Sequence, residues 1–123
     1  MESSKKAIFI KNWILDYVNS MPKKAESLVI GISGGIDSSV SSTLSAMTGL
    51  KTIVLSMPIK QKDTQHDLSL RHQDWLKENF KNVQGHTLEL DSLFKTFENT
   101  LDNFGSEHGM ANSRARLRMT TLY

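Results

Sequence analysis

Apolar residues near the start of the chain recur at spacings of three and four positions, the period of an amphipathic helix. They are Ile10, Trp13, Ile14, Tyr17 and Val18, and Lys11, Asn12 and Asp16 lie between them. Either Ser3 or Ser4 is a candidate N-cap for this helix. Pro22 interrupts the pattern, so we expect the helix to end just before it.

Short apolar runs farther along the chain predict three β-strands. Residues 27–32 (SLVIGI) and 51–57 (KTIVLSM) are nearly continuous and rich in β-branched side chains, as in strands covered on both faces. Residues 86–90 (HTLEL) alternate between polar and apolar side chains, which predicts a third strand.

The segments after the first two predicted strands have helical character. Residues 38–48 are mostly small and are followed by Gly49, which ends the helix. The next helix is expected to begin at Asp63 or Thr64. We expect its apolar face to comprise Leu68, His72, Trp75, Leu76 and Phe80.

The last part of the chain predicts two more helices. Asp91 or Ser92 is expected to cap the first of them. Its apolar stripe comprises Leu93, Phe94, Phe97, Leu101 and Phe104. The stretch GSEHGMANS, residues 105–113, is predicted to be a loop, and a final helix is expected to begin near Met110 or Ala111.

The predicted order is one helix, then three strand–helix pairs, then a final helix. This alternation predicts an α/β fold in which a parallel sheet carries helices on both faces. A length of 123 residues suits one domain. The last predicted helix still continues at Tyr123 without a cap or a closing strand. We therefore expect residues 1–123 to be the N-terminal portion of a single domain whose sheet is incomplete.

Composition and charge narrow the classes of partner. The net charge is +2, too small for an extended nucleic-acid surface, and no apolar run approaches membrane-spanning length, so we expect neither partner. Acids and lysines interrupt the N-terminal apolar stretch, which argues against a signal peptide. The chain has no cysteine, which excludes a disulfide framework and a thiolate metal site. The spacing of His66, His72, His86 and His108 favours surface or packing roles over metal binding.

Two adjacent glycines, Gly34 and Gly35, lie where the first predicted strand ends and a helix begins. Parallel α/β sheets bind ligands at such junctions, and glycines let the backbone turn sharply and approach a ligand closely. The N–H groups and the dipole at the start of a helix favour an anion. Ser33, Ser38 and Ser39 add hydroxyl donors. The sequence therefore predicts a phosphate-binding loop.

Asp37 indicates that a cation accompanies the phosphate. A carboxylate beside a phosphate is repulsive unless a cation lies between them, and Mg²⁺ is typically held by one or two carboxylates together with phosphate oxygens. The loop has neither the lysine of the Walker sequence nor the dinucleotide pattern G-x-G-x-x-G. Two alternatives are a structural turn capped by Asp37 and a hydrolase elbow, G-x-S-x-G, with Ser33 as nucleophile. We favour a magnesium-bound di- or triphosphate, because it accounts for the glycines, the serines and the acid together.

Two stretches of the sequence are similar to motifs of known enzymes. SGGIDSS, residues 33–39, resembles the PP-loop, S-G-G-x-D-S, of the ATP pyrophosphatases, which adenylate a substrate and release pyrophosphate. NSRARLRM, residues 112–119, resembles the N-x-x-A-R-x-R-M stretch of the ammonia-dependent NAD synthetases in that superfamily. On a helix, Arg114 and Arg118 lie on one side, while Arg116 points nearly opposite. The resemblance covers essentially the whole chain and implies an adenine nucleotide alpha-hydrolase-like fold.

The resemblance also implies a function and a set of site residues. The reaction is the ATP-dependent amidation of nicotinic acid adenine dinucleotide (deamido-NAD) to NAD with ammonia, through an adenylate and pyrophosphate release, in a cytoplasmic homodimer. The ATP-binding residues would be Gly31, Ile32, Ser33, Gly34, Gly35, Ile36, Asp37 and Ser38. Asp37 would be the magnesium ligand, and Arg116 would contact the dinucleotide substrate. No side chain is assigned as a catalytic acid or base.

The sequence departs from this family after the second predicted strand. The family often has an arginine two residues before the proline of the following turn and a glutamine four residues after it. Here those positions hold Ser56 and Lys62, with Gln61 one place early, so we assign no adenine contact. The alternatives are another PP-loop ATP pyrophosphatase, of the GMP synthetase or tRNA-modifying type, or an inactive nucleotide-binding fragment.

Overall fold

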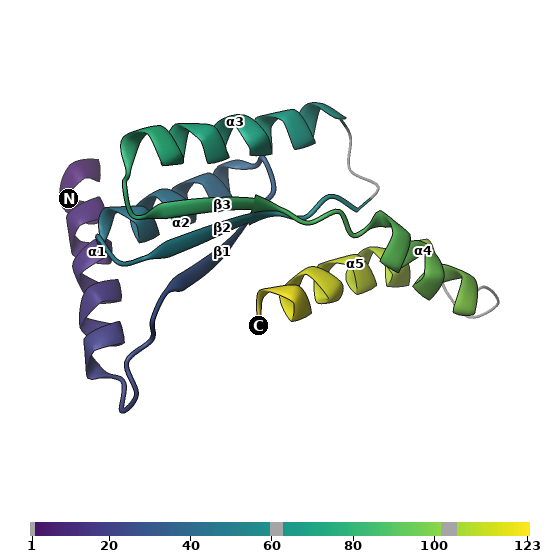
Figure 1. Ribbon diagram of the computed structural model, residues 1–123, viewed down its shortest axis with the longest axis horizontal. Coiled ribbons are helices and arrows are strands. Elements are labelled where there is room, and N and C mark those ends of the chain that lie inside the picture. Colours follow the sequence, from purple (N-terminus) through teal and green to yellow (C-terminus); the bar gives the residue numbers. More distant parts are fainter. Residues whose placement is uncertain (1, 60–62, 102–105) are drawn as a thin grey trace.

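The computed structural model describes residues 2–59, 63–101 and 106–123. In chain order its elements are α1 (Ser3–Ser20), β1 (Leu28–Ile32), α2 (Ile36–Met47), β2 (Thr52–Ser56), α3 (Asp63–Asn79), β3 (Val83–Thr87), α4 (Asp91–Thr100) and α5 (Glu107–Leu122) (Figure 1). The predicted alternation of helices and strands is confirmed. None of the helices in these described parts has the length and apolarity needed to cross a lipid bilayer.

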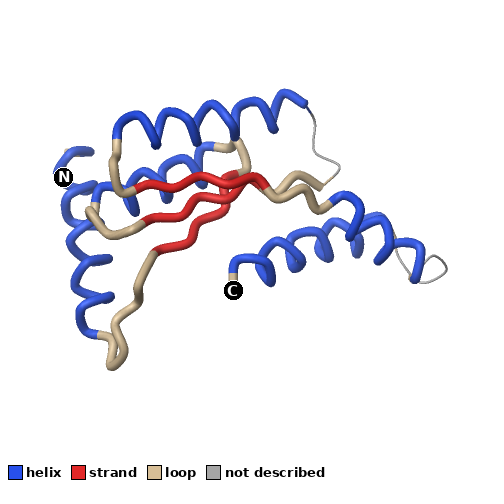
Figure 2. Tube along the Cα trace, in the orientation of Figure 1, coloured by secondary structure: helices blue, strands red, loops and turns tan. Residues whose placement is uncertain are grey.

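The three strands form one parallel sheet in the order β1-β2-β3 (Figure 2). In register, Leu28 of β1 lies beside Thr52 of β2, which lies beside Val83 of β3. All three strands therefore end at the same edge of the sheet, where Ile32, Ser56 and Thr87 are neighbours. The glycine loop begins directly after this edge.

Apolar side chains pack against both faces of the sheet. On one face they come from all three strands together with α2 and α3, and comprise Ile32, Ala46, Val54, Leu76 and Val83, with Phe80 beside them. On the other face they come from β2, the segment after it, and α4, and comprise Leu55, Met57, Ile59, Leu90 and Phe94. Met110, Leu117 and Leu122 of α5 complete this second cluster. In Figure 1, α2 and α3 accordingly lie on one side of the sheet and α5 on the other, which confirms the predicted fold class.

Helix α1 packs less deeply than its pattern predicts. Of its side chains only Val18 is buried, while Trp13 and Tyr17 are 59% and 58% exposed and stack on each other with ring centroids 5.4 Å apart. The predicted N-cap at Ser3 or Ser4 is wrong. The helix begins at Ser3, the cap residue is Glu2, and the Glu2 carbonyl accepts from Lys6 N at 3.0 Å.

The buried face of α3 is more polar than predicted. Leu76 is completely buried, but its buried companions are Ser69 and Gln73, whereas Leu68 and Trp75 remain 49% and 45% exposed. The polar side chains are tolerated there because the strand ends supply hydrogen-bond partners for them. The predicted face is therefore wrong in part.

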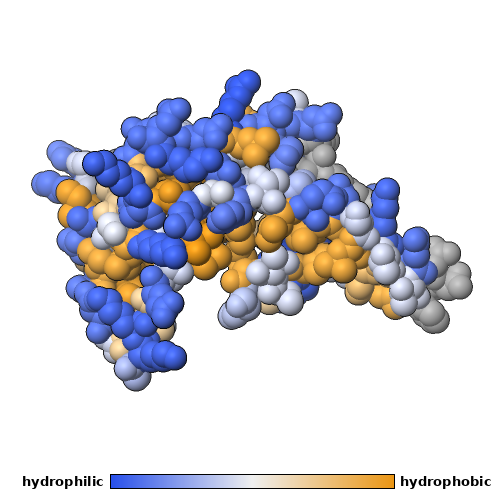
Figure 3. All heavy atoms as spheres, viewed as in Figure 1, coloured by the Kyte–Doolittle hydropathy of each residue, from blue (hydrophilic) through white to orange (hydrophobic). Residues whose placement is uncertain are grey.

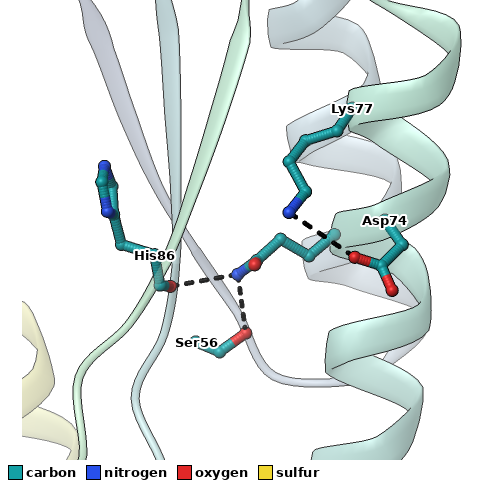
Figure 4. Close-up of polar contacts among 5 residues, drawn as sticks. Ser56, Asp74, Lys77 and His86 are labelled. Atoms are coloured by element: carbon teal, nitrogen blue, oxygen red, sulfur yellow. Dashed lines mark hydrogen bonds and ion pairs between the residues drawn. The ribbon is translucent and has the colours of Figure 1, made fainter.

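Gln73 shows how these polar side chains are satisfied. Its Nε2 donates to the carbonyl of His86 at 3.0 Å and to Ser56 Oγ at 3.3 Å (Figure 4). Ser69 Oγ bonds to Ser56 Oγ and donates to the carbonyl of Ile32 at 3.1 Å. Helix α3 is thus tied to the ends of all three strands. Gly85 leaves the space for this arrangement, because a Cβ there would lie 2.6 Å from Gln73 Cγ.

Strand β3 lies three residues earlier than predicted, at Val83–Thr87 instead of 86–90. Pairing with β2 begins as soon as α3 has ended, and Thr52 N donates to Asn82 O at 2.9 Å. The residues predicted as strand still follow the edge of the sheet, since Leu88 N donates to Ser56 O and Leu90 N to Pro58 O, at 2.8 and 3.1 Å. Their alternation therefore reflects an extended segment beyond the strand.

The starts of α4 and α5 also differ from the predictions. Leu90, and not Asp91 or Ser92, is the cap residue of α4, and Glu89 Oε1 accepts from Asp91 N at 2.7 Å. Most of the predicted loop 105–113 belongs to α5, because Ser106 caps the helix by accepting from Gly109 N at 3.0 Å. Phe104, predicted on the α4 stripe, lies outside the described residues.

We expect Leu76→Ala to lower the free energy of unfolding by about 2–5 kcal/mol, because it removes a completely buried side chain from the core. Leu68→Ala, on the same helix, should cost roughly 1 kcal/mol or less, because Leu68 is half exposed. Urea denaturation of the two variants measures the difference. Equal losses would contradict this orientation of α3.

Candidate functional site

The glycine loop joins the carboxyl end of β1 to the start of α2, as predicted. Gly34 has φ = +92°, a conformation that other residues rarely adopt. A Cβ at this position would also collide with the backbone carbonyl oxygen of Gln65, in the first turn of α3. Conformation and space both require glycine here.

Serine hydroxyls hydrogen-bond within the loop. Ser38 Oγ accepts from Ser33 N at 3.0 Å and lies 3.1 Å from Ser33 Oγ, which accepts from Gly35 N at 3.2 Å. Ser38 and Ser39 also donate to the Gly35 carbonyl, at 3.3 and 2.8 Å. The hydroxyls therefore hold the backbone in a tight turn.

The start of α2 offers free backbone donors next to this turn. Gly35 is the cap residue, and no side chain caps the helix. The first N–H groups of a helix have no partner within it, and they carry the positive end of the dipole. Asp37 lies in the first turn with an exposed side chain, and Ile36 is 77% exposed. The arrangement suits an anion at the helix start and a cation beside Asp37.

A cavity of 630 Å³ lies between the loop and α5. Of the predicted ATP-binding residues, Gly31, Ile32, Ser33 and Gly35 line it, whereas Gly34, Ile36, Asp37 and Ser38 do not. Its other walls come from the segment after β2, from Gln65 and from one side of α5. Figure 3 shows apolar side chains in orange around the space between the sheet and α5.

Two arginines face the loop across this cavity. Arg114 and Arg118 both line it. The guanidinium of Arg118 donates from Nε to the carbonyl of Met57 at 3.0 Å, and that of Arg114 lies 5.7 Å from the centre of the Phe94 ring. Burial and the neighbouring charge of Arg114 lower the pKa of Arg118, while Asp91 opposes this shift. Sequence reasoning placed these arginines on one side of a helix but gave them no role.

Arg116 lies on the opposite side of α5. It lines a second cavity, of 450 Å³, between α4 and α5, together with Leu93, Phe97 and Thr120. The structure therefore does not bring Arg116 into the cavity of the glycine loop, and its role as a substrate contact stays a prediction.

The histidines have other surroundings. His72 Nε2 lies 2.9 Å from Ser42 Oγ, which donates to the Ser38 carbonyl at 2.7 Å. Burial lowers the pKa of His72, and a hydrogen bond to the Ser39 backbone partly opposes it. Ser42 is completely buried, so this pair joins α2 to α3 in the interior. In the described ranges no three His, Cys, Asp or Glu side chains gather as a metal site.

The departures after β2 have one structural consequence. Ser56, the first of these departures, is buried beneath α3, bonds to Ser69 and does not line the loop cavity. Gln61 and Lys62 lie outside the described residues. The side chain of Ser56 is used to join β2 to α3.

Known proteins match this chain in sequence and in structure. The sequence model described as NAD synthase matches residues 7–123. The NH(3)-dependent NAD(+) synthetase of Mesoplasma florum is 34% identical over 119 residues, which cover 91% of this chain and 46% of that protein.

Two solved structures cover the whole chain. One is the NMN synthetase from Francisella tularensis, with a TM-score of 0.86 and 31% identity over 49% of that chain. The other is the NH3-dependent NAD synthetase from Campylobacter jejuni in complex with the nitrate ion, with a TM-score of 0.82 and 27% identity over 51% of that chain. The chain spans about half the length of each of these three proteins.

The loop geometry predicts unequal costs for two glycine substitutions. Gly34 and Gly49 both have positive φ, but a Cβ at Gly49 would meet open space. Gly49→Ala should therefore cost only the conformational strain, about 1–3 kcal/mol. Gly34→Ala should cost about 1–3 kcal/mol more, because of the collision with Gln65. Denaturation curves compare the two, and similar costs would mean that α3 does not confine the loop.

Proposed function

The chain belongs to the NAD synthase family, and on this basis we propose that the protein catalyses the ATP-dependent amidation of deamido-NAD to NAD with ammonia. A carboxylate oxygen of the substrate attacks the α-phosphorus of ATP, and pyrophosphate leaves. Ammonia then attacks the carboxyl carbon of the adenylate, AMP leaves, and the nitrogen loses a proton to water. The family assignment bears out the resemblance seen in SGGIDSS and NSRARLRM, and the predicted PP-loop α/β fold.

The observation that carries this proposal is the position of the glycine loop. It lies at the carboxyl end of β1 and leads into the start of α2, and it lines a cavity of 630 Å³. A phosphate chain bound there gains backbone and hydroxyl donors at a positive helix end. Developing negative charge on the leaving pyrophosphate is stabilised by donors that are already in place.

Magnesium is part of the same proposal, with Asp37 as its ligand. The Asp37 carboxylate is exposed in the first turn of α2. It offers the oxygen ligands that Mg²⁺ prefers. When bound, the ion supplies positive charge to the phosphate oxygens. Asp37 would hold the ion beside the phosphates that the loop binds.

We assign the dinucleotide substrate to the side of α5 that carries Arg116. The second cavity combines an arginine with aromatic and apolar walls, Phe97 and Leu93 among them. A guanidinium suits phosphate or carboxylate, and aromatic walls suit a flat ring. We therefore expect Arg116→Met to weaken the binding of deamido-NAD. Competition between deamido-NAD and a fluorescent analogue measures this binding.

A homodimer and a cytoplasmic location complete the proposal. Exposed apolar side chains on α1, such as Phe9, Trp13 and Tyr17, offer an area that a second copy would cover. The cytoplasm supplies the ATP that the reaction consumes. Sedimentation of the intact protein as a monomer at micromolar concentration would contradict the dimer.

A second candidate is amidation of the mononucleotide, giving NMN. It is favoured by the likeness to the NMN synthetase from Francisella tularensis, which has a TM-score of 0.86. The relatives do not favour a GMP synthetase or a tRNA-modifying enzyme. Supplying the two nicotinate nucleotides separately, with ATP and ammonia, identifies the substrate by its product.

We expect Asp37→Asn to reduce magnesium-dependent pyrophosphate release on the order of 100-fold or more, because the variant loses the charge that holds the ion. Release is measured in the intact protein with ATP, ammonia and either nicotinate nucleotide. Asp74→Asn is the matched control, since Asp74 is exposed on α3 and pairs with Lys77 at 3.5 Å. Unchanged release in Asp37→Asn would refute the loop assignment, and magnesium-dependent ATP binding without turnover would identify an inactive nucleotide-binding protein.

A further inference from the structure

We propose that Arg114 and Arg118 form an anion clamp that binds the phosphate chain of the nucleotide from the side opposite the glycine loop. The inference rests on the proposed function, because it takes the ligand of the cavity to be a nucleoside triphosphate. It adds binding residues on α5 that the sequence did not assign, and it separates their role from that of Arg116.

The two arginines and the loop share one cavity. Arg114 and Arg118 are four residues apart on α5, so their side chains leave the same side of the helix, and both line the cavity with Ser33 and Gly35. The loop brings Ser33 and Gly35 to one wall. The arginines bring positive charge to the other. A bound phosphate chain would therefore have donors on two sides.

Arg118 is fixed in a position to bind. Its Nε donates to the Met57 carbonyl at 3.0 Å, just beyond the end of β2. A guanidinium has five N–H donors. The bond from Nε fixes the plane of the group and leaves the N–H donors of its two terminal nitrogens for a ligand. No described residue accepts a hydrogen bond from these terminal groups or forms an ion pair with them. Little side-chain entropy would be lost when an anion binds to a group that is already held.

Arg114 adds a second charge that the described residues do not pair. Its guanidinium lies over the Phe94 ring, 5.7 Å from the centre, and it makes no ion pair with any of those residues. The positive charge of Arg114 lowers the pKa of Arg118, because the two like charges repel each other. An anion between them would relieve this repulsion. Two guanidinium groups are better suited to bind a polyphosphate, which has several oxygens, than to bind a single carboxylate.

The test measures binding of magnesium pyrophosphate to the intact protein by calorimetry. Charge-assisted hydrogen bonds of this kind predict that Arg118→Met and Arg114→Met each weaken binding roughly 10- to 100-fold. We expect Arg118→Lys to recover part of the loss, because it keeps the charge but lacks the fork. Arg71→Met, the same change at an exposed arginine of α3 that lines neither of the two cavities, should leave pyrophosphate affinity within about twofold.

The variants distinguish this inference from the proposed function. If Arg114→Met and Arg118→Met bind pyrophosphate as the wild type does while Asp37→Asn does not, the clamp is refuted and the loop assignment stands. If Arg71→Met loses as much affinity as Arg118→Met, the effect is one of overall charge and the clamp is again refuted. A wild-type protein that neither binds pyrophosphate nor releases it from ATP would overturn both. Arg114→Met keeps the test open if loss of the Met57 bond unfolds Arg118→Met, because the side chain of Arg114 makes no hydrogen bond to the main chain of a described residue.

Discussion

The close contact between the glycine loop and helix α3 is the constraint on which the candidate site depends. The Gln65 carbonyl occupies the space that any side chain at Gly34 would need. One turn later, Ser69 donates to the carbonyl of Ile32, the last residue of β1, and Gln73 reaches the other two strands. Helix α3 therefore restricts the conformation of the loop, and the loop conformation in turn sets the direction in which α2 begins.

Much of the fold could be predicted, because apolar runs lie between clear breakers. The bounds of β1, α2 and β2 fall within two residues of their predictions, since Gly34, Gly49 and Pro58 punctuate this part of the chain. The errors arise where local pattern and tertiary contacts disagree. The position of β3 is set by pairing with β2, and the buried face of α3 is set by hydrogen bonds to strand ends that lie far away in sequence. Neither the strand pairing nor these hydrogen bonds can be predicted from the spacing of apolar residues.

The site was predictable as a loop but not as a cavity. The glycines, serines and acid of residues 33–39 point to a phosphate because their chemistry is local. Which side chains face that loop from across the cavity depends on how α5 packs on the second face of the sheet. The helical period separates Arg114 and Arg118 from Arg116, yet only the packing of Leu117 and Leu122 against the sheet decides which side meets the loop.

The indole of Trp75 gives this protein a built-in optical reporter. It stacks on His72, with ring centroids 5.7 Å apart, and His72 is hydrogen-bonded to Ser42 of α2. Because imidazole quenches indole emission most strongly when it is charged, the fluorescence of Trp75 depends on the protonation of His72. A shift of α2 that changes the hydrogen bond between Ser42 and His72 would alter this contribution to the emission, which adds to that of Trp13, without any added dye.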